Sequence, residues 1–214
     1  NLILKFSYAV FNMRKPANKF SGRKPIKVRG EHASVVEITD RRHPLHGYVQ
    51  RTKLRGTPSP RYNLALTLAH LFFPNNFSEI VAVSADLKVT HSRRIPVDKQ
   101  SQKAIEQAYA GVAESNAIKS QNRRIRRFVT PEFLEMFKEA GIIPNANFVN
   151  IGFVRGRTPV FFEVAYIDLN KAENFAARIK DHALRDQAIA ILTSLRKTIP
   201  IDRQGKLVNV PDVE

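Results

Sequence analysis

The chain has 214 residues, of which 43% are hydrophobic, so it is long enough and apolar enough to fold around a real core. It contains no cysteine, which excludes disulfide bonds, thiol nucleophiles and zinc sites with cysteine ligands. Thirty-five basic residues against nineteen acidic ones give a net charge of +16, which favours polyanionic partners such as nucleic acid. No apolar run is as long as a membrane span, so we expect a cytoplasmic protein without a membrane partner.

The first part of the chain, residues 1–90, is predicted to be rich in strands. It begins with a short packed element, followed over residues 12–29 by an exposed arm rich in Lys and Arg. Ser59 and Pro60 begin a buried helix that is expected to end near Phe73. Three strands are expected, at residues 30–40, 47–54 and 77–87.

The second part, residues 91–214, is predicted to be mainly helical. Asp98 caps one helix, and Thr130 caps a shorter one that stops at Gly141. Two further helical runs, at residues 171–180 and 183–195, are expected to pack beneath a hairpin, with Asn170 as the cap of the first. The sequence therefore predicts an α+β protein.

Two apolar runs separated by Arg-Gly-Arg-Thr predict a β-hairpin over residues 148–167. With Gly156 and Arg157 at the tip, residues whose numbers sum to 313 face each other, and Asn150 lies opposite Glu163. Their Cβ atoms would then be roughly 5 Å apart. An amide beside a carboxylate is a candidate oxygen site for a hard cation, although an ordinary hairpin with one polar rung would show the same pattern.

The polar residues around this hairpin are spaced as in protein kinases, and the segment resembles a degenerate, small RIO-like member of that fold. In kinases a catalytic Asp is followed five residues later by an Asn, and a metal-binding acid follows on the hairpin. Asn145, Asn150 and Glu163 stand at these three positions. The resemblance, which covers residues 30–168, implies that Asn150 and Glu163 hold Mg²⁺ and that Asn145 orients the acceptor hydroxyl. It also implies two lobes, the first rich in strands and the second helical.

The same resemblance implies an ATP site. Gly30 and Ser34 would lie near the phosphates, where the family has a glycine-rich loop and this chain has a single glycine. Arg51 stands in the place of the lysine that pairs with ATP, and Lys53 on the same strand face is the alternative. The helix beginning after Ser59 corresponds to the one that carries a glutamate partner in the family, but it contains no acidic residue. Both basic residues would also be unremarkable as solvent-facing strand charges.

The densest charge lies in residues 119–127 (KSQNRRIRR), where five of nine residues are basic. Beside Phe128 these side chains are candidates to bind RNA or DNA phosphates, although a solvated helix face would have the same composition. The candidate nucleic-acid residues are Arg123, Arg124, Arg126 and Arg127.

Three functions follow from these patterns. The first is a kinase-like phosphotransferase that uses ATP and Mg²⁺. The second is an inactive pseudokinase that acts as a scaffold for a protein partner, because Asn145 is a poor proton acceptor and the glutamate partner is missing. The third is a basic nucleic-acid-binding protein that is not an enzyme and has no ATP site.

Overall fold

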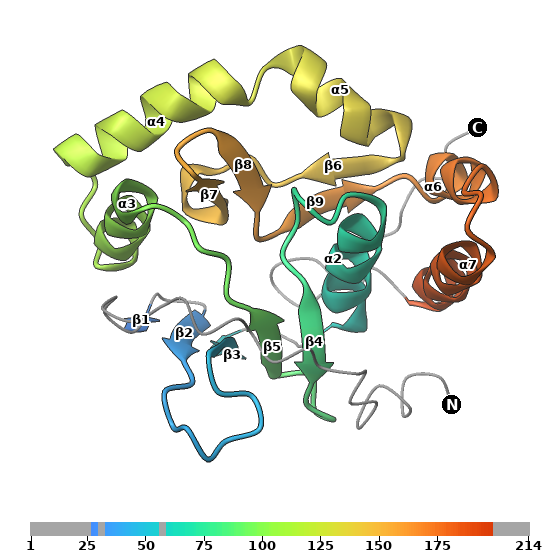
Figure 1. Ribbon diagram of the computed structural model, residues 1–214, viewed down its shortest axis with the longest axis horizontal. Helices are drawn as coiled ribbons and strands as arrows, with labels where there is room; N and C mark the ends of the chain where they lie inside the picture. The colour runs from blue at the N-terminus through green and yellow to red at the C-terminus, as the bar shows by residue number, and fades with distance from the viewer. Residues whose placement is uncertain (1–26, 30–32, 56–58, 199–214) are drawn as a thin grey trace.

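The N-terminal part of the chain forms a five-stranded antiparallel sheet in the order β1-β2-β3-β5-β4 (Figure 1). The computed structural model describes residues 27–29, 33–55 and 59–198, and every structural statement concerns these residues. β-Branched residues are frequent in the inner strands, as expected for a pleated, half-buried surface. The strands are β1 (Lys27–Arg29), β2 (Ala33–Glu37), β3 (Tyr48–Lys53), β4 (Ile80–Val83) and β5 (Val89–Arg93).

The sheet agrees with two of the predicted strands and differs in three places. Residues 27–29 belong to β1, although they were predicted as part of a basic loop. The run at residues 77–87 contains β4 only in its middle. β5 was not predicted because its sequence, VTHSR, is too polar to stand out, and it extends the sheet past residue 90. The remainder of the basic arm, Gly30 and the tail from residue 199 lie outside the described residues.

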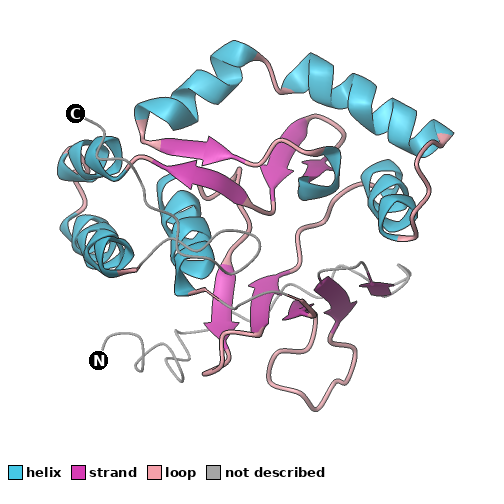
Figure 2. Cartoon of the chain, turned by 180° about the vertical axis from the view of Figure 1, so that it is seen from behind, coloured by secondary structure: helices cyan, strands magenta, loops and turns pink. Residues whose placement is uncertain are grey.

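A mostly helical region with two small antiparallel strand pairs follows the sheet, and Figures 1 and 2 show it from opposite sides. No helix in the described ranges is both long and apolar enough to cross a membrane. The helices are α3 (Lys99–Tyr109), α4 (Asn116–Phe128), α5 (Pro131–Glu139), α6 (Leu169–Ala177) and α7 (His182–Lys197). The other elements are β6 (Ile142–Pro144), the 3₁₀ turn η1 (Phe148–Asn150), β7 (Ile151–Val154), β8 (Thr158–Phe161) and β9 (Val164–Ile167).

Local signals placed most helix ends correctly. Asp98 caps α3 by accepting from the Ser101 amide at 2.8 Å, and Thr130 caps α5 by accepting from the Phe133 amide at 3.2 Å. α6 differs, because Asp168 rather than Asn170 is its cap. The charge-rich stretch at residues 119–127 belongs to α4, for which no helix had been predicted.

Gly141 ends α5 with a backbone conformation that other residues rarely adopt. Its φ is +69°, in the left-handed region. A Cβ placed there would lie 2.3 Å from the carbonyl oxygen of Asp168 and 2.7 Å from the amide nitrogen of Ala172. Glycine at this position therefore allows the start of α6 to lie directly against the end of α5.

The hairpin of β7 and β8 is shorter than predicted, and its register differs by one residue. Ile151 faces Phe161, whereas the predicted register placed Phe162 there. Arg155 and Gly156 have φ values of +51° and +77°. These left-handed conformations belong to a three-residue turn that replaces the predicted two-residue tip and shifts every facing pair.

Asn150 and Glu163 lie beside this hairpin and do not face each other across one of its rungs. Asn150 closes the turn η1, and Glu163 lies between β8 and β9. β9 pairs with β6 and therefore does not continue the hairpin with β7. The amide of Phe162 donates to the carbonyl oxygen of Asn150 at 2.8 Å, so the two segments still meet through the backbone.

Helix α2 (Pro60–Phe72) joins the sheet to the helical region, and its termini match the prediction, with Ser59 as the cap. It is apolar on two sides and contributes to two hydrophobic clusters. Ala65 and Leu68 pack with α7, whereas Leu66 and Ala69 pack with a cluster of phenylalanines. The fully buried phenylalanine side chains are Phe77, Phe137, Phe153 and Phe161.

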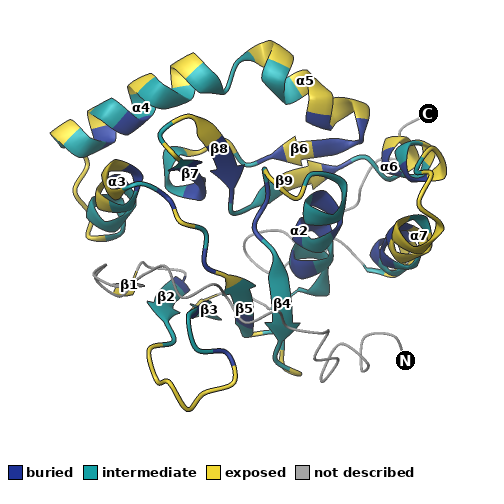
Figure 3. Cartoon of the chain, in the orientation of Figure 1, coloured by how far each residue is buried: buried dark blue, intermediate teal, exposed yellow. Residues whose placement is uncertain are grey.

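The buried residues lie mainly in these two hydrophobic clusters (Figure 3). Phe137 on α5 and Phe161 on β8 contact edge to face, with ring centroids 5.7 Å apart, a favourable geometry for aromatic pairs. The outward sides of α4 and α5 carry exposed residues, while β8 between them and the sheet is mostly buried. The phenylalanine cluster therefore lies under α4 and α5, on the hairpin that leads to Glu163, and the second cluster lies between α2, α6 and α7.

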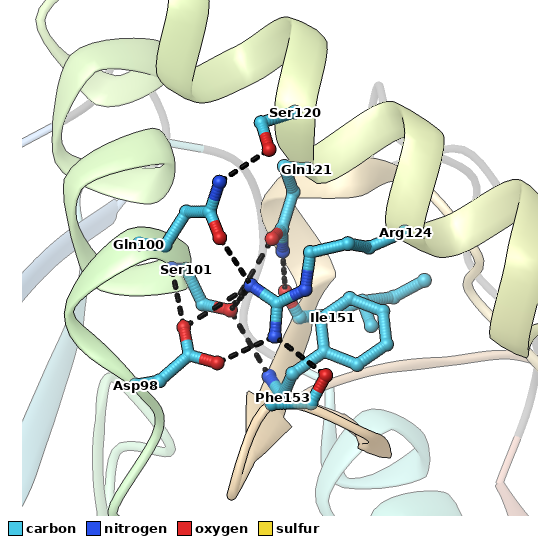
Figure 4. A network of polar contacts seen from close by, with 9 residues as sticks. Asp98, Gln100, Ser101, Ser120, Gln121, Arg124, Ile151 and Phe153 are labelled. Atoms are coloured by element: carbon cyan, nitrogen blue, oxygen red, sulfur yellow. Dashed lines mark hydrogen bonds and ion pairs between the residues drawn. The ribbon is translucent and has the colours of Figure 1, made fainter.

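A polar network holds this hairpin to α3 and α4 (Figure 4). The Arg124 guanidinium donates to both carboxylate oxygens of Asp98, at 2.5 and 3.1 Å, and to the carbonyl oxygen of Gly156 at 3.1 Å. Nearby, the Gln121 amide donates to the carbonyl oxygen of Ile151 at 2.7 Å. Ser101 accepts from the Phe153 amide at 3.2 Å, so both ends of β7 are fixed by helix side chains.

The charge on Asp98 depends on this network. Burial alone would raise the pKa of Asp98, but the hydrogen bonds from Arg124 and from the Ser101 amide outweigh it and hold the pKa below its ordinary 3.8. A carboxyl with a lowered folded-state pKa stabilises the fold above its unfolded-state pKa. That stability is lost as the pH falls through the folded-state value.

We expect Asp98→Asn to retain the helix cap and lose the ion pair, because Asn and Asp cap helices equally well. The free energy of unfolding at pH 7 should fall by about 1 kcal/mol, less than the roughly 1.5–3 kcal/mol typical of a charged hydrogen bond, because the carboxylate is partly exposed. The difference from wild type should shrink when urea unfolding is repeated below pH 3.8. Asp181→Asn, at the exposed cap of α7, is the matched control and should show little loss at either pH. A pH-independent difference for Asp98→Asn would contradict the role of its charge.

Candidate functional site

The Glu163 carboxylate is the centre of a cluster that brings together four of the predicted site residues. Arg51 Nη2 on β3 donates to Glu163 Oε1 at 2.8 Å. Asn145 and Asn150 donate through Nδ2 to Glu163 Oε2 at 3.0 and 2.9 Å. We refer to Arg51, Tyr62, Asn145, Asn150 and Glu163 as the Glu163 cluster.

Backbone hydrogen bonds set the position of Glu163. The amide of Asn145 donates to the carbonyl oxygen of Glu163 at 3.0 Å, and the amide of Phe162 donates to the carbonyl oxygen of Asn150 at 2.8 Å. Residues 162 and 163 are therefore held between the two ends of the loop that joins β6 to β7. The two Asn side chains converge on the carboxylate because both ends of their loop are tied to the same dipeptide.

Tyr62 of α2 completes the cluster and was not predicted. Its hydroxyl donates to the carbonyl oxygen of Phe162 at 3.2 Å and lies 3.5 Å from Glu163 Oε1. Its ring lies under the Arg51 guanidinium, 4.8 Å from Cζ to the ring centroid. The available signal was a tyrosine on a mostly apolar helix, and it specified no partner.

The protonation states in the cluster follow from burial and from the neighbouring charges. Burial acts most strongly on Arg51 and would lower its pKa, but the neighbouring Tyr62 and Glu163 together raise the pKa above the ordinary value. Burial also raises the pKa of Tyr62. At neutral pH the guanidinium is therefore charged, and the tyrosine hydroxyl keeps its proton as a hydrogen-bond donor.

A cavity of about 150 Å³ lies beside the cluster. Its walls are mainly apolar, and Arg51, Arg93, Glu106 and Glu163 supply charge. Sites for drug-sized ligands span roughly 300–1,000 Å³, so this cavity encloses only part of a nucleotide. Apolar wall residues include Val35 and Val49 from the sheet, Ile105 and Tyr109 from α3, and Phe162.

The polar groups of the cluster do not fit a divalent cation as they are arranged. Both oxygens of Glu163 already accept from protein donors. The hydrogen bonds orient the amide groups of Asn145 and Asn150 with their NH₂ groups toward the carboxylate, so neither offers an oxygen there. No group of three or more Asp, Glu, His or Cys side chains able to hold a metal occurs in the described segments.

Two residues predicted to bind nucleotide, Ser34 and Lys53, do not line the cavity. Ser34 pairs with Thr52, so its side chain lies on the opposite face of the sheet from Arg51 and the cavity. The kinase-like resemblance implied a phosphate-binding loop at Ser34, whereas the residue belongs to β2, within the strand expected at residues 30–40. Lys53 shares the face of Arg51 at the end of β3, where burial and the Arg51 charge lower its pKa, but it does not line the cavity.

The four arginines predicted to bind nucleic acid divide into two groups. Arg123, Arg126 and Arg127 are exposed on the outer face of α4. Arg124 points inward, and its guanidinium lies 4.3 Å from the Phe153 ring centroid and binds Asp98. Arg124 is therefore a structural residue, because its guanidinium is already used within the fold.

Comparison with known proteins adds no family to this description. The chain matches no protein-family model and no curated protein sequence. The inference of function therefore depends on the contacts within the structure.

We expect Glu163→Gln to lower the free energy of unfolding by about 1–3 kcal/mol, because it removes a charged acceptor and turns an NH₂ group toward other donors. Urea denaturation measures the loss. Glu135→Gln, which removes the partner of an exposed ion pair with Lys138, is the matched control and should cost less than about 0.5 kcal/mol. Equal losses in the two variants would show that the cluster does not support the fold.

Proposed function

We propose that the protein is a degenerate kinase-like protein whose phosphotransfer site has become a fixed polar cluster, that is, a two-lobed pseudokinase. The observation that carries the proposal is the ion pair between Arg51 and Glu163. In the family the corresponding lysine pairs with a glutamate of the adjacent helix and the corresponding acid binds metal. Here the two positions neutralise each other.

The order of the parts along the chain supports the kinase-like reading. A strand carries Arg51, helix α2 follows it, and a loop with Asn145 and Asn150 precedes the hairpin and Glu163. Residues separated by more than a hundred positions meet where the resemblance requires a single site. The cavity beside them has the apolar walls expected of a reduced ATP site.

Three features favour an inactive member. An amide stands at the position of the catalytic Asp, and its nitrogen donates to Glu163, so Asn145 cannot take a proton from an acceptor hydroxyl. Helix α2 carries no acid and contributes Tyr62 instead. Binding of Mg²⁺ would have to break three hydrogen bonds to one carboxylate, each worth about 1.5–3 kcal/mol when charged groups take part.

On this proposal the protein acts by binding a protein partner and does not turn over ATP. The cluster then holds the sheet and the hairpin in one fixed arrangement for that partner. Nucleic-acid binding, the alternative suggested by the charge, concerns a different surface and does not depend on the cluster.

The test reintroduces the lysine and the aspartate that kinases have at the positions of Arg51 and Asn145. We expect ATP with MgCl₂ to leave the melting temperature of the wild-type protein unchanged, with ATP alone and MgCl₂ alone as controls. The double variant Arg51→Lys, Asn145→Asp places a second carboxylate beside Glu163. It also replaces the guanidinium of Arg51, which competes with Mg²⁺ for Glu163, by a lysine ammonium. It should gain an Mg²⁺-dependent rise of several degrees once nucleotide exceeds Kd about a hundredfold.

A shift in the wild-type protein and the absence of a shift in the double variant test different parts of the proposal. An Mg²⁺-dependent shift in the wild-type protein would overturn the inactive site and favour a working nucleotide site. No shift in a double variant that remains folded by circular dichroism would overturn the kinase-like reading itself.

A further inference from the structure

The outer face of α4 is a continuous basic surface. At 100° per residue, four basic side chains lie together on the side of the helix opposite Ile118, Gln121 and Phe128, which pack inward. The sequence of α4 contains no acidic residue. We refer to Lys119, Arg123, Arg126 and Arg127 as the α4 basic face.

The charges of this face are poorly neutralised by the fold. Lys119 pairs with Glu114 at 2.9 Å, but both side chains are mostly exposed. Across the described part of the chain, Arg123, Arg126 and Arg127 form no ion pair, and Arg127 only approaches the ring of its neighbour Phe128. Like charges three and four residues apart destabilise a helix, and an anionic ligand would remove this repulsion.

Arg124 connects the α4 basic face to the tip of the β7–β8 hairpin. It projects inward from α4 and donates to the carbonyl oxygen of Gly156 while paired with Asp98 (Figure 4). Gly156 lies between Arg155 and Arg157, both exposed. Two further basic residues, Arg155 and Arg157, therefore flank the hairpin residue that Arg124 binds.

The α4 basic face contains a shallow hollow. It is lined by Lys119, Asn122, Arg123 and Arg126, with Ile125 beneath them. Guanidinium groups present paired N–H donors that match phosphate oxygens, and an amide beside them adds a neutral donor. These neighbouring side chains can therefore donate several hydrogen bonds to one phosphate group.

We propose that the α4 basic face and the hairpin-tip arginines bind the phosphate backbone of nucleic acid without regard to sequence. Contacts to phosphate carry no base information, and nothing on this face is arranged to read base edges. A membrane surface fits less well, because an interfacial helix buries its apolar side in lipid. The apolar side of α4 is already buried against the core, through Ile118, Ile125 and Phe128.

The test compares two triple variants of the full chain with equal loss of charge. Arg123→Gln, Arg126→Gln, Arg127→Gln removes most of the α4 basic face. Arg41→Gln, Arg42→Gln, Arg178→Gln removes three exposed arginines elsewhere. Both variants retain the basic residues before residue 30, so a contribution from that arm is the same in each.

Binding is followed by fluorescence anisotropy with labelled duplex DNA, duplex RNA and single-stranded RNA, each over a range of salt concentrations. We expect the slope of log K against log salt on duplex DNA to become shallower by up to about 2.7 in the α4 variant, at about 0.9 per contact, and to stay unchanged in the control. Single strands should show a smaller change, at about 0.7 per contact. Unchanged melting temperatures verify that both variants are folded.

Three results would overturn the proposal. The first is absence of wild-type binding at low salt, and the second is an equal loss in both variants, which would assign binding to net charge alone. The third is stronger binding to anionic phospholipid vesicles than to any nucleic acid, lost in the same α4 variant. None of these outcomes bears on the Glu163 cluster, so this proposal and the kinase-like proposal fail independently.

Discussion

The arrangement of this protein depends on one charge pair, between Arg51 of the sheet and Glu163 beside the hairpin. Both side chains are largely removed from solvent, and an unpaired charge there would be costly. The pair is stabilised because Asn145 and Asn150 donate to the other carboxylate oxygen, while the Tyr62 ring lies against the Arg51 guanidinium. Four separate segments of the chain must therefore be in place together, which couples the sheet to the helical region.

The same requirement limits the chemistry that the cluster can perform. A carboxylate that accepts from three protein side chains has little capacity left for a cation, and an amide that donates to it cannot act as a base. Helix α2, buried on two sides, carries a tyrosine whose hydroxyl stays protonated. Stability and cation binding need different partners for a carboxylate, and Glu163 has the partners that favour stability.

The arginines of α4 have different environments because their side chains point in different directions. Arg124, among otherwise exposed arginines, satisfies Asp98 and a backbone carbonyl and holds the hairpin tip. Its three neighbours retain their charge at the surface. One arginine-rich segment thus contributes both to the core contacts of β7 and to an exposed basic surface on the opposite side of the helix.

The sequence by itself determined the features that depend on neighbouring residues. The caps Ser59, Asp98 and Thr130 and the stop at Gly141 were predictable, because capping and left-handed φ involve only a few consecutive residues. The sequence also placed Asn150 near Glu163, but through a hairpin register that is wrong by one residue, and Asn145 was added only by the kinase-like resemblance. Only the tertiary structure decided the hairpin register, the polar strand β5, the face of Ser34, and the roles of Tyr62 and Arg124. Each of these is set by partners distant in the chain, and local sequence does not specify those contacts.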